Sequence, residues 1–382
     1  MALRSRADTS ALGRWFWTID HWTLLAIFTL ICFGYVMMLA ASPAVAEHIG
    51  QSRDIFILKQ VVFLAAAGVL TVAVSLLSLS GVRRLALIGC GVAFVLTVAT
   101  LVIGVQIKGA SRWISLPGLS LQPSEFLKPF FAVTAAWLIS EQRRQPGFYG
   151  WISAIVLAGM IVGALKLQPD IGMLAVIVMV FFAQTFIAGV NLFIVGALGG
   201  LIAAASVGAY FLFKHVRDRI DPFLSWNGAE HYQVIRAKQA FGAGGLSGRG
   251  PGEGRVKDVL PDAHADFVFA VTGEEFGLIV CSVIVMLFAF IVLRGLIRLL
   301  KEQDLFVILA AGGLVTGFGL QAFINMGSTM GLLPTKGMTL PFISYGGSSV
   351  LAVAFGMGML LALTRRRHGA GTAWGHNAGS AP

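Results

Sequence analysis

The chain has 382 residues, of which 57% are hydrophobic and only 12% are charged. Soluble domains carry about 25% charged residues, so the composition excludes a soluble protein and indicates a membrane protein. A formal net charge of +10 could suggest nucleic-acid binding, but Lys and Arg stand in short clusters between apolar runs, which membrane orientation explains better. The three cysteines lie inside apolar runs, without the spacing of a disulfide framework or a metal site.

Apolar runs along the chain set the expected fold class, an all-α polytopic membrane protein. A helix needs about 20 apolar residues to cross the roughly 30 Å hydrocarbon core of a bilayer. Ten runs come near that length, so we expect about ten transmembrane helices. They cover residues 22–42, 55–79, 84–105, 124–140, 150–167, 171–188, 191–213, 267–293, 304–326 and 342–364.

Positively charged residues gather in every second connection between these runs. Cytoplasmic loops carry an excess of Lys and Arg, so these clusters and both termini are expected on the cytoplasmic side. The clusters are Arg4, Arg6 and Arg14; Arg83 and Arg84; Arg143 and Arg144; Arg294, Arg298 and Lys301; and Arg365, Arg366 and Arg367. The alternate connections then face outward, including one long extracytoplasmic loop over 214–266, between the seventh and eighth helices.

The runs also define the expected domain organisation. We expect a cytoplasmic N-terminal segment over 1–21, a single ten-helix membrane domain over 22–364, and a disordered Gly- and Ala-rich cytoplasmic tail over 365–382. An Ala-x-Ala pattern at 43–48 resembles a signal-peptidase site, but the apolar run before it exceeds the roughly 7 to 15 residues of a signal peptide. An uncleaved first helix is therefore expected, whereas cleavage would leave nine spans.

The stretch "QPSEFLK" places charges at the start of the fourth run. Charged residues at membrane depth are expensive and mark candidate functional sites. Ser124 suits a helix start, Glu125 lies in the first turn, and Lys128 follows three residues later on the same face. A capped helix with an internal ion pair explains Glu125 equally well, but Lys128 lies too deep for simple snorkelling. Arg112, in the connection before this run, is an interface anchor or part of the site.

Two further outer connections contain candidate polar groups. Asp170 opens the sixth run, where a carboxylate is stabilised by the helix dipole, so capping alone accounts for it. In the loop over 214–266, "QAFGAGGLSGRGPGEGR" matches neither the Rossmann nor the P-loop pattern, so a phosphate-binding loop is rejected. A mobile lid or hairpin close to a ligand is expected there instead.

The stretch "PDAHADFVFAVTGEEFG", residues 261 to 277, brings carboxyls to the mouth of the eighth run. Asp266 directly precedes "FVFAV", at the helix entrance, where its carboxylate meets the positive helix end. Glu274 and Glu275 lie about two turns inside the span, so at least one of them must face a polar cavity or a cation. Between the last two runs, Gly and Pro predict a re-entrant-like loop that contains Lys336 and Ser344.

Together these clusters predict an outward-facing polar cavity with Asp266 at its rim and further carboxyls and lysines below. Such a cavity suits a membrane-embedded enzyme that acts on a lipid-linked anionic substrate. It also suits a transporter, and the polar residues alone leave both possibilities open.

Four ordered segments, "QPSEFLK", "QPDIG", "AHADFVFAVTGEEFG" and "PTKGMTLPFISYGGSS", closely resemble the signature segments of the SEDS family of bacterial cell-wall proteins, which includes FtsW, RodA and SpoVE. The match runs through most of the chain. Lys and Thr in "PTKGMTLP", with Arg-Trp-Ile after "KGAS", resemble the division member FtsW more than the elongation member RodA. Two positions depart from the family pattern: Asp262 replaces the more usual Glu, and Ala265 the more usual Thr or Ser.

The resemblance implies an inverting peptidoglycan glycosyltransferase that polymerises lipid II at the division septum. It implies a location in the bacterial cytoplasmic (inner) membrane, an active site on the outer face, and a class b penicillin-binding protein and other divisome proteins as partners. Asp266 matches the family's essential aspartate and is the candidate general base. Lys128, Arg112 and Lys336 would stabilise the leaving pyrophosphate, with Mg²⁺ or Mn²⁺ as a candidate cofactor.

The remaining candidate substrate-binding residues are Ser124, Glu125, Asp170, Glu274, Glu275 and Ser344. Three alternative functions stay open at this point. They are a lipid II flippase, a RodA-like elongation polymerase, and a non-catalytic divisome scaffold.

Overall fold

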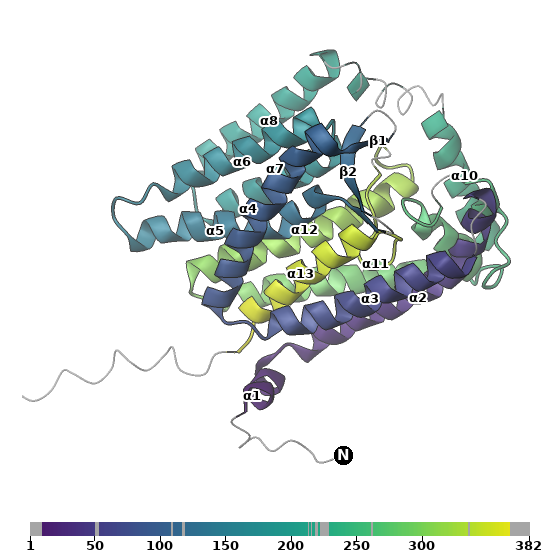
Figure 1. The fold of residues 1–382 in the computed structure, drawn as a ribbon, viewed down its shortest axis with the longest axis horizontal. Helices are drawn as coiled ribbons and strands as arrows, with labels where there is room; N and C mark the ends of the chain where they lie inside the picture. The colour runs from purple at the N-terminus through teal and green to yellow at the C-terminus, as the bar shows by residue number, and fades with distance from the viewer. Residues whose placement is uncertain are drawn as a thin grey trace, which may run out of the picture.

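The computed structural model describes residues 10–49, 53–107, 110–116, 119–212, 214, 216–217, 221, 229–260, 263–334 and 337–366. Within these residues the chain forms a bundle of long helices with one small sheet at its edge (Figure 1). Before the long loop, the helices are α1 (Ala11–Thr18), α2 (His21–Ile49), α3 (Arg53–Ser75), α4 (Leu79–Ile103), α5 (Pro123–Arg144), α6 (Gly150–Leu167), α7 (Ile171–Ile187) and α8 (Leu192–Leu212). After it come α10 (Ala229–Gly244), the 3₁₀ turn η1 (Val256–Asp258), α11 (Val268–Leu299), α12 (Leu305–Thr329) and α13 (Gly347–Leu363).

The helices confirm the all-α membrane class. Each of the ten expected runs coincides with one long helix. Seven of the helices in the described parts of the chain are long and apolar enough to cross a membrane, namely α2, α3, α4, α6, α8, α11 and α12. Helices α7 and α13 are apolar but have 17 residues each, and α5 has charged residues in its first and last turns. The ten-span count therefore stays a prediction.

The connection over 106–123, expected as an outer loop, contains a sheet. Strands β1 (Val105–Ile107), β2 (Ala110–Leu116) and β3 (Leu119–Leu121) form an antiparallel sheet in the order β1-β2-β3. Val105 pairs with Trp113, and Ile114 pairs with Leu121. The sequence signal was the alternation Ile-Ser-Leu and Leu-Ser-Leu on the two sides of Pro-Gly, which is typical of a hairpin.

The long loop differs from the expected mobile lid or hairpin. Its described part contains α10, which packs against α11 and α12, and η1, which contacts α2 and α11. The packing is close, because buried side chains of α10 such as Ala237 and Ala240 join the main hydrophobic core. This part of the loop is therefore an integral layer of the fold.

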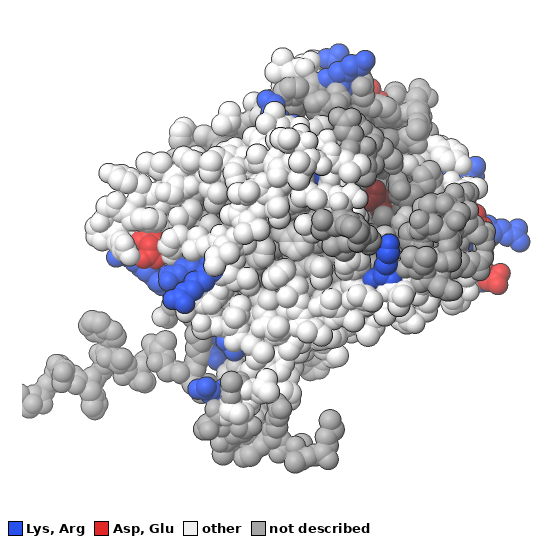
Figure 2. All heavy atoms as spheres, viewed as in Figure 1, with Lys and Arg blue, Asp and Glu red and all other residues white. Residues whose placement is uncertain are grey.

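Helix α5 is the centre of the bundle, since it packs against α4, α6, α7, α12 and α13. Helix α13 in turn lies along α3, and α8 packs on α7 at the periphery (Figure 1). The face shown in Figure 2 is largely uncharged, with Lys, Arg, Asp and Glu placed mainly toward its ends. A bundle with such a surface fits a hydrocarbon environment, where exposed charge is costly.

Ion pairs also connect helices at the end of the bundle that contains the Arg-rich connections. Asp20, just before α2, is 2% exposed and accepts hydrogen bonds from Arg294 at 2.7 and 2.8 Å and from Thr23 at 2.8 Å. The Arg298 guanidinium lies 2.8 Å from the same carboxylate. Burial alone would raise the pKa of Asp20, but these hydrogen bonds and charges outweigh burial and hold it below its usual value.

Candidate active site

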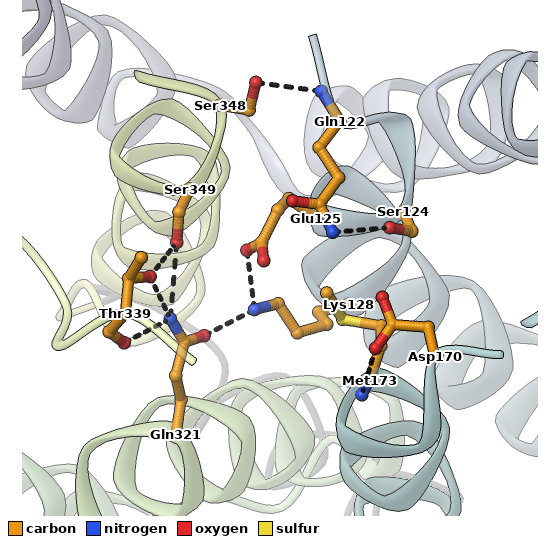
Figure 3. Close-up of polar contacts among 10 residues, drawn as sticks. All are labelled: Gln122, Ser124, Glu125, Lys128, Asp170, Met173, Gln321, Thr339, Ser348 and Ser349. Atoms are coloured by element: carbon orange, nitrogen blue, oxygen red, sulfur yellow. Dashed lines mark hydrogen bonds and ion pairs between the residues drawn. The ribbon is translucent and has the colours of Figure 1, made fainter. Parts of the chain in front are cut away.

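The start of α5 places an ion pair inside the protein. Pro123 occupies the first helical position, and Glu125 and Lys128 follow on one face of the helix. The Lys128 ammonium lies 2.7 Å from Glu125 Oε2 and donates a hydrogen bond of 2.6 Å to Gln321 Oε1 of α12 (Figure 3). Both charged residues are less than 10% exposed. The expected pair is confirmed, and Lys128 does not snorkel to the surface.

Asp170 lies next to this pair, at the start of α7 (Figure 3). Its carboxylate caps α7 by accepting the N–H of Met173 at 3.3 Å, as expected. Arg112 of β2 reaches the same place: its guanidinium lies 3.6 Å from Asp170 and donates to the carbonyls of Gln168 and Pro169. Burial raises the pKa of the Asp170 carboxyl, and the Arg112 charge does not fully offset that effect. Arg112 thus binds the start of α7 beside Asp170, close to the Glu125–Lys128 pair.

Buried hydroxyls and amides extend the group toward α13. Gln321 Nε2 donates to the Thr339 carbonyl at 3.0 Å and lies 3.3 Å from the Ser349 hydroxyl. At the helix starts, Ser124 accepts from the Gln122 side chain at 3.3 Å, and Ser348 accepts from the Gln122 backbone N–H at 3.0 Å. These contacts join the N-terminal ends of α5 and α13 with the C-terminal half of α12.

Asp266 lies two residues before α11 and is half-buried, which confirms its expected place at the helix entrance. A Cβ added to Gly337 would lie 3.5 Å from Asp266 Oδ2, so the carboxylate faces the loop that contains "PTKGMTLP". The Asp266 carbonyl accepts a hydrogen bond of 2.9 Å from Asn325 of α12. Lys336 and Asp262 lie outside the described residues.

Ser344 holds the segment before Asp266 in place. Its hydroxyl donates to the Ala265 carbonyl at 2.6 Å and accepts the Leu340 N–H at 2.7 Å. The Tyr345 N–H also donates to the His264 carbonyl at 2.9 Å. Ser344 is fully buried, so these contacts point to a structural role beside Asp266.

Glu274 and Glu275 bind the long loop. Glu274 accepts the backbone N–H groups of Arg255 at 2.9 Å and Val256 at 3.0 Å. Glu275 accepts from Lys257 Nζ at 2.6 Å and from the Gly252 N–H at 2.9 Å. The expected cation is therefore Lys257. The side-chain hydrogen bonds of the two glutamates are with residues 252–257, and the structure does not bring them into the Lys128 group.

Helix α11 is broken at Gly277, and the same loop forms hydrogen bonds with the main chain on both sides of the break. Gly277 has φ 78° and ψ −178°, which glycine adopts without a Cβ penalty. Around the break, the N–H groups of Leu278 and Ile279 donate to carbonyls of residues 245 and 246, at 3.0 and 3.2 Å. The carbonyls of Glu274 and Glu275 accept the N–H groups of residues 249 and 250, each at 3.0 Å. The loop thus replaces the helical hydrogen bonds that the break removes.

The length of α11 explains how the chain tolerates this arrangement. The helix has 32 residues and would be about 48 Å long, more than the roughly 30 Å hydrocarbon core. The part after Gly277, Leu278–Leu299, has 22 residues (299 minus 277) and alone measures about 33 Å. The first turns, with both glutamates, can then lie beside the membrane core and inside protein.

A small cavity lies under Lys128 and Gln321. Its volume is about 40 Å³, and its other walls are apolar side chains and glycines of α12 and α13, with Pro129 of α5. A water molecule needs at least about 10–15 Å³ on this measure, so the cavity has room for a few waters.

The residues of the site do not fit a resident divalent cation. No group of three or more His, Cys, Asp or Glu side chains with metal-binding geometry occurs among the residues that the structure covers. The Glu125 and Asp170 carboxylates are each paired with a cation, Glu125 with Lys128 and Asp170 with Arg112. We therefore derive no step through a protein-held metal.

The sequence reasoning missed three polar side chains, Gln321, Asn325 and Lys257. Gln321 and Asn325 are amides four residues apart in an apolar helix, and polar groups at membrane depth are a signal of function. That signal was available. Lys257 had none, since a lysine in a long charged loop is normally solvated.

Comparisons with known proteins identify the family. Residues 21–369 match the family model of the FtsW, RodA and SpoVE proteins, described as "Cell cycle protein". The chain is 43% identical over 367 residues to a probable peptidoglycan glycosyltransferase FtsW of Caulobacter vibrioides, covering 96% of this chain and 94% of the relative. A protein of the same name from Geobacter sulfurreducens is 37% identical, with 91% and 95% covered.

Solved structures share the fold. One comes from work described as "Structural coordination of polymerization and crosslinking by a peptidoglycan synthase complex"; its TM-score is 0.76, with 25% identity over 91% of this chain and 97% of that one. The rod shape determining protein RodA of Thermus thermophilus gives 0.66, with 24% identity over 91% and 96%. With four signature segments in order and a matching fold, the chain belongs to the FtsW, RodA and SpoVE family, the SEDS family of bacterial cell-wall proteins.

Proposed function

We propose that this protein is a peptidoglycan glycosyltransferase that polymerises lipid II for septal cell-wall synthesis. Relatives with 37–43% identity are named probable peptidoglycan glycosyltransferases FtsW. The structural observation that carries the proposal is the position of Asp266, a half-buried carboxylate at a helix entrance, linked through α12 to the buried Lys128 ammonium. A base and a cation held by one helix are the groups that sugar transfer from a pyrophosphate donor requires.

Asp266 is the proposed general base. Formation of a β-linkage from an α-linked lipid donor inverts the anomeric carbon, so the acceptor 4-hydroxyl attacks in line and loses its proton as the bond forms. The proton passes to the Asp266 carboxylate, and undecaprenyl pyrophosphate leaves from the opposite face of the sugar. A half-buried carboxylate is suited to this, because water and substrate can both reach it.

The leaving pyrophosphate develops negative charge, which fixed cations stabilise. Lys128, Arg112 and Lys336 are the proposed cations. Glu125 and Asp170 orient Lys128 and Arg112 through the observed ion pairs, and Ser124 belongs to the same start of α5. For Glu274, Glu275 and Ser344 we propose positioning roles, because their observed partners are protein groups.

The proposed setting is the bacterial inner membrane at the division septum. The residues of the site lie at the ends of α5, α7, α11 and α13 that follow the outer connections, so the site would face away from the cytoplasm. Ten spans over 22–364, with cytoplasmic segments over 1–21 and 365–382, remain the proposed organisation. A structural neighbour comes from a peptidoglycan synthase complex, which supports a class b penicillin-binding protein as partner.

The decisive experiment measures glycan-chain formation from lipid II. The protein would be purified with its cognate class b penicillin-binding protein, supplied with lipid II and a divalent cation, and compared with Asp266→Asn. Glu253→Gln is the matched control, since it changes an exposed carboxylate of the long loop to an amide.

Polymer from the wild type and the control, but not from Asp266→Asn, would support the proposal. Equal polymer from both Asp266 forms would remove Asp266 as the base. If a folded, partner-bound wild type makes no polymer, fluorescent lipid II in sealed vesicles decides next. Movement of that lipid across the membrane would favour a flippase, and no movement would favour a scaffold.

A further inference from the structure

Two buried amide side chains lie one turn apart on α12. Gln321 is 2% exposed and Asn325 is 1% exposed. Residues four apart share one face of a helix, at a rise of about 6 Å. Both amides therefore point from one rigid element toward the loop that contains Met338 and Thr339.

Asn325 joins that loop to the segment before α11. Its Nδ2 donates to the Met338 carbonyl at 2.6 Å and to the Asp266 carbonyl at 2.9 Å. An amide nitrogen has two hydrogens, so both are used. The main chain of Asp266 is thus fixed to α12 and to the Met338 loop by a single side chain.

Gln321 joins the neighbouring residue of the loop to α5. Its Nε2 donates to the Thr339 carbonyl at 3.0 Å, and its Oε1 accepts from Lys128 at 2.6 Å (Figure 3). An ammonium only donates, so the amide oxygen must face Lys128 and the nitrogen must face the loop. This fixes the orientation of the Gln321 side chain.

Consecutive carbonyls, those of Met338 and Thr339, are therefore held by amides on consecutive turns of one helix. The same two amides also contact the proposed catalytic groups. Asn325 binds the main chain of Asp266, and Gln321 binds the Lys128 ammonium. We propose that Gln321 and Asn325 are positioning residues that keep Asp266 and Lys128 in catalytic register. The inference rests on the proposed function, because it assigns the two amides to that reaction.

The test compares conservative and apolar variants in the complex with the penicillin-binding protein. Asn325→Leu removes both bonds at similar volume, and Gln321→Glu keeps an acceptor for Lys128 but loses the donor to Thr339. Gln184→Met is the matched control: Gln184 is also a fully buried amide, and it donates to the Ala132 and Leu309 carbonyls, at 2.6 and 3.1 Å. The two residues are also alike in their amide oxygens: Gln184 Oε1 and Asn325 Oδ1 are both buried, and neither has a hydrogen-bond partner in the described structure.

We expect kcat for lipid II polymerisation to fall by roughly 10- to 100-fold in Asn325→Leu and Gln321→Glu, because small misplacements of reacting groups have effects of this size. KM should change by less than about threefold, since lipid II binding uses other groups as well. Gln184→Met should keep kcat per folded molecule. Equal kcat losses in all three variants, or changes confined to KM, would overturn the proposal.

A second readout does not depend on activity. Amide hydrogen exchange of segments 263–267 and 337–346 should speed up together in Asn325→Leu and stay unchanged in Gln184→Met. Unchanged exchange in Asn325→Leu would refute the inference that Asn325 holds the Met338 loop and the Asp266 segment together. If the wild-type complex forms no polymer, the proposed function fails, and the exchange result still decides whether Asn325 holds the two segments together.

Discussion

Lys257 Nζ lies 2.6 Å from Glu275 Oε1, and the two side chains are 5% and 0% exposed. The ammonium also donates to the carbonyls of Ala40 at 2.9 Å and Gly252 at 3.0 Å, so its three donors have three acceptors. One lysine of the long loop thus ties α11 to α2. Because every donor of the buried ammonium has an acceptor, removal of either charged partner should lower the stability of the fold.

Lys257→Met should destabilise the folded protein by about 3–5 kcal/mol, because it leaves the Glu275 charge buried without its cation. Thermal unfolding of the purified protein in nanodiscs measures this. The double variant Lys257→Met with Glu275→Gln should be more stable than the single variant, since no unpaired charge remains and the amide oxygen can still accept from Gly252. Equal stability of the single and double variants would show that burial of charge is not the cause.

Lys128→Met should lower kcat by roughly 100- to 1000-fold, the usual effect of removing one group that stabilises transition-state charge. Lys128→Arg should recover only part, since a planar guanidinium cannot reproduce a point contact with Gln321 and Glu125. Lys166→Met, which changes an exposed lysine in the last turn of α6, serves as control. Polymerisation rates per folded, partner-bound molecule measure the effect, and a loss no larger than that of the control would argue against a role for Lys128.

Gly34→Ala should destabilise the fold by about 1–3 kcal/mol. A Cβ at this position of α2 would lie 2.1 Å from the main-chain oxygen of Phe342, whose own φ is 63°. Backbone cannot yield as a side-chain tip can, so α2 and the loop over 337–346 must separate. Gly159→Ala in α6 is the control, because its Cβ would meet nothing within 4 Å and alanine favours the helix. Thermal unfolding that ranks the two variants in the opposite order would contradict this reading.

Asp20 predicts a pH dependence. Its pKa is below the ordinary value in the folded protein, so its carboxylate adds stability at pH values above the unfolded pKa of about 3.9. That contribution is lost as the pH falls through the lower folded pKa. The unfolding temperature of the wild type should therefore decrease more steeply below about pH 4 than that of Asp20→Asn, which should be the less stable form at pH 7. Parallel curves would mean that Asp20 does not contribute.

Hydropathy and charge predicted the helices well, because a long apolar run has few alternatives in a bilayer. The positions of Asp170 as a cap and of the Glu125–Lys128 pair also followed from local spacing. The partners of Glu274 and Glu275 could not be predicted. They come from a loop about 20 residues earlier in the chain, and spacing rules reach only one or two helical turns.

The sheet over 105–121 and the amides of α12 were predictable in part. The alternation of apolar and polar residues typical of a hairpin was present in residues 114–121, but it lies between two long apolar runs that predict helices. For Gln321 and Asn325 the sequence places two amides on one face of α12, but it does not give their partners. Those partners, Lys128 and the Met338 loop, are brought together only by the packing of α5, α12 and α13.

The break at Gly277 constrains how the protein is made. Residues 245–250 leave the ribosome before α11, and they can pair with residues 274–279 only after that part of α11 has been made. Until then two carbonyls and two N–H groups of α11 lack partners, each at about 1–3 kcal/mol if buried. The first turns of α11 therefore cannot complete their folding on their own. Folding of this region should instead end with a docking step, in which the loop closes the broken helix.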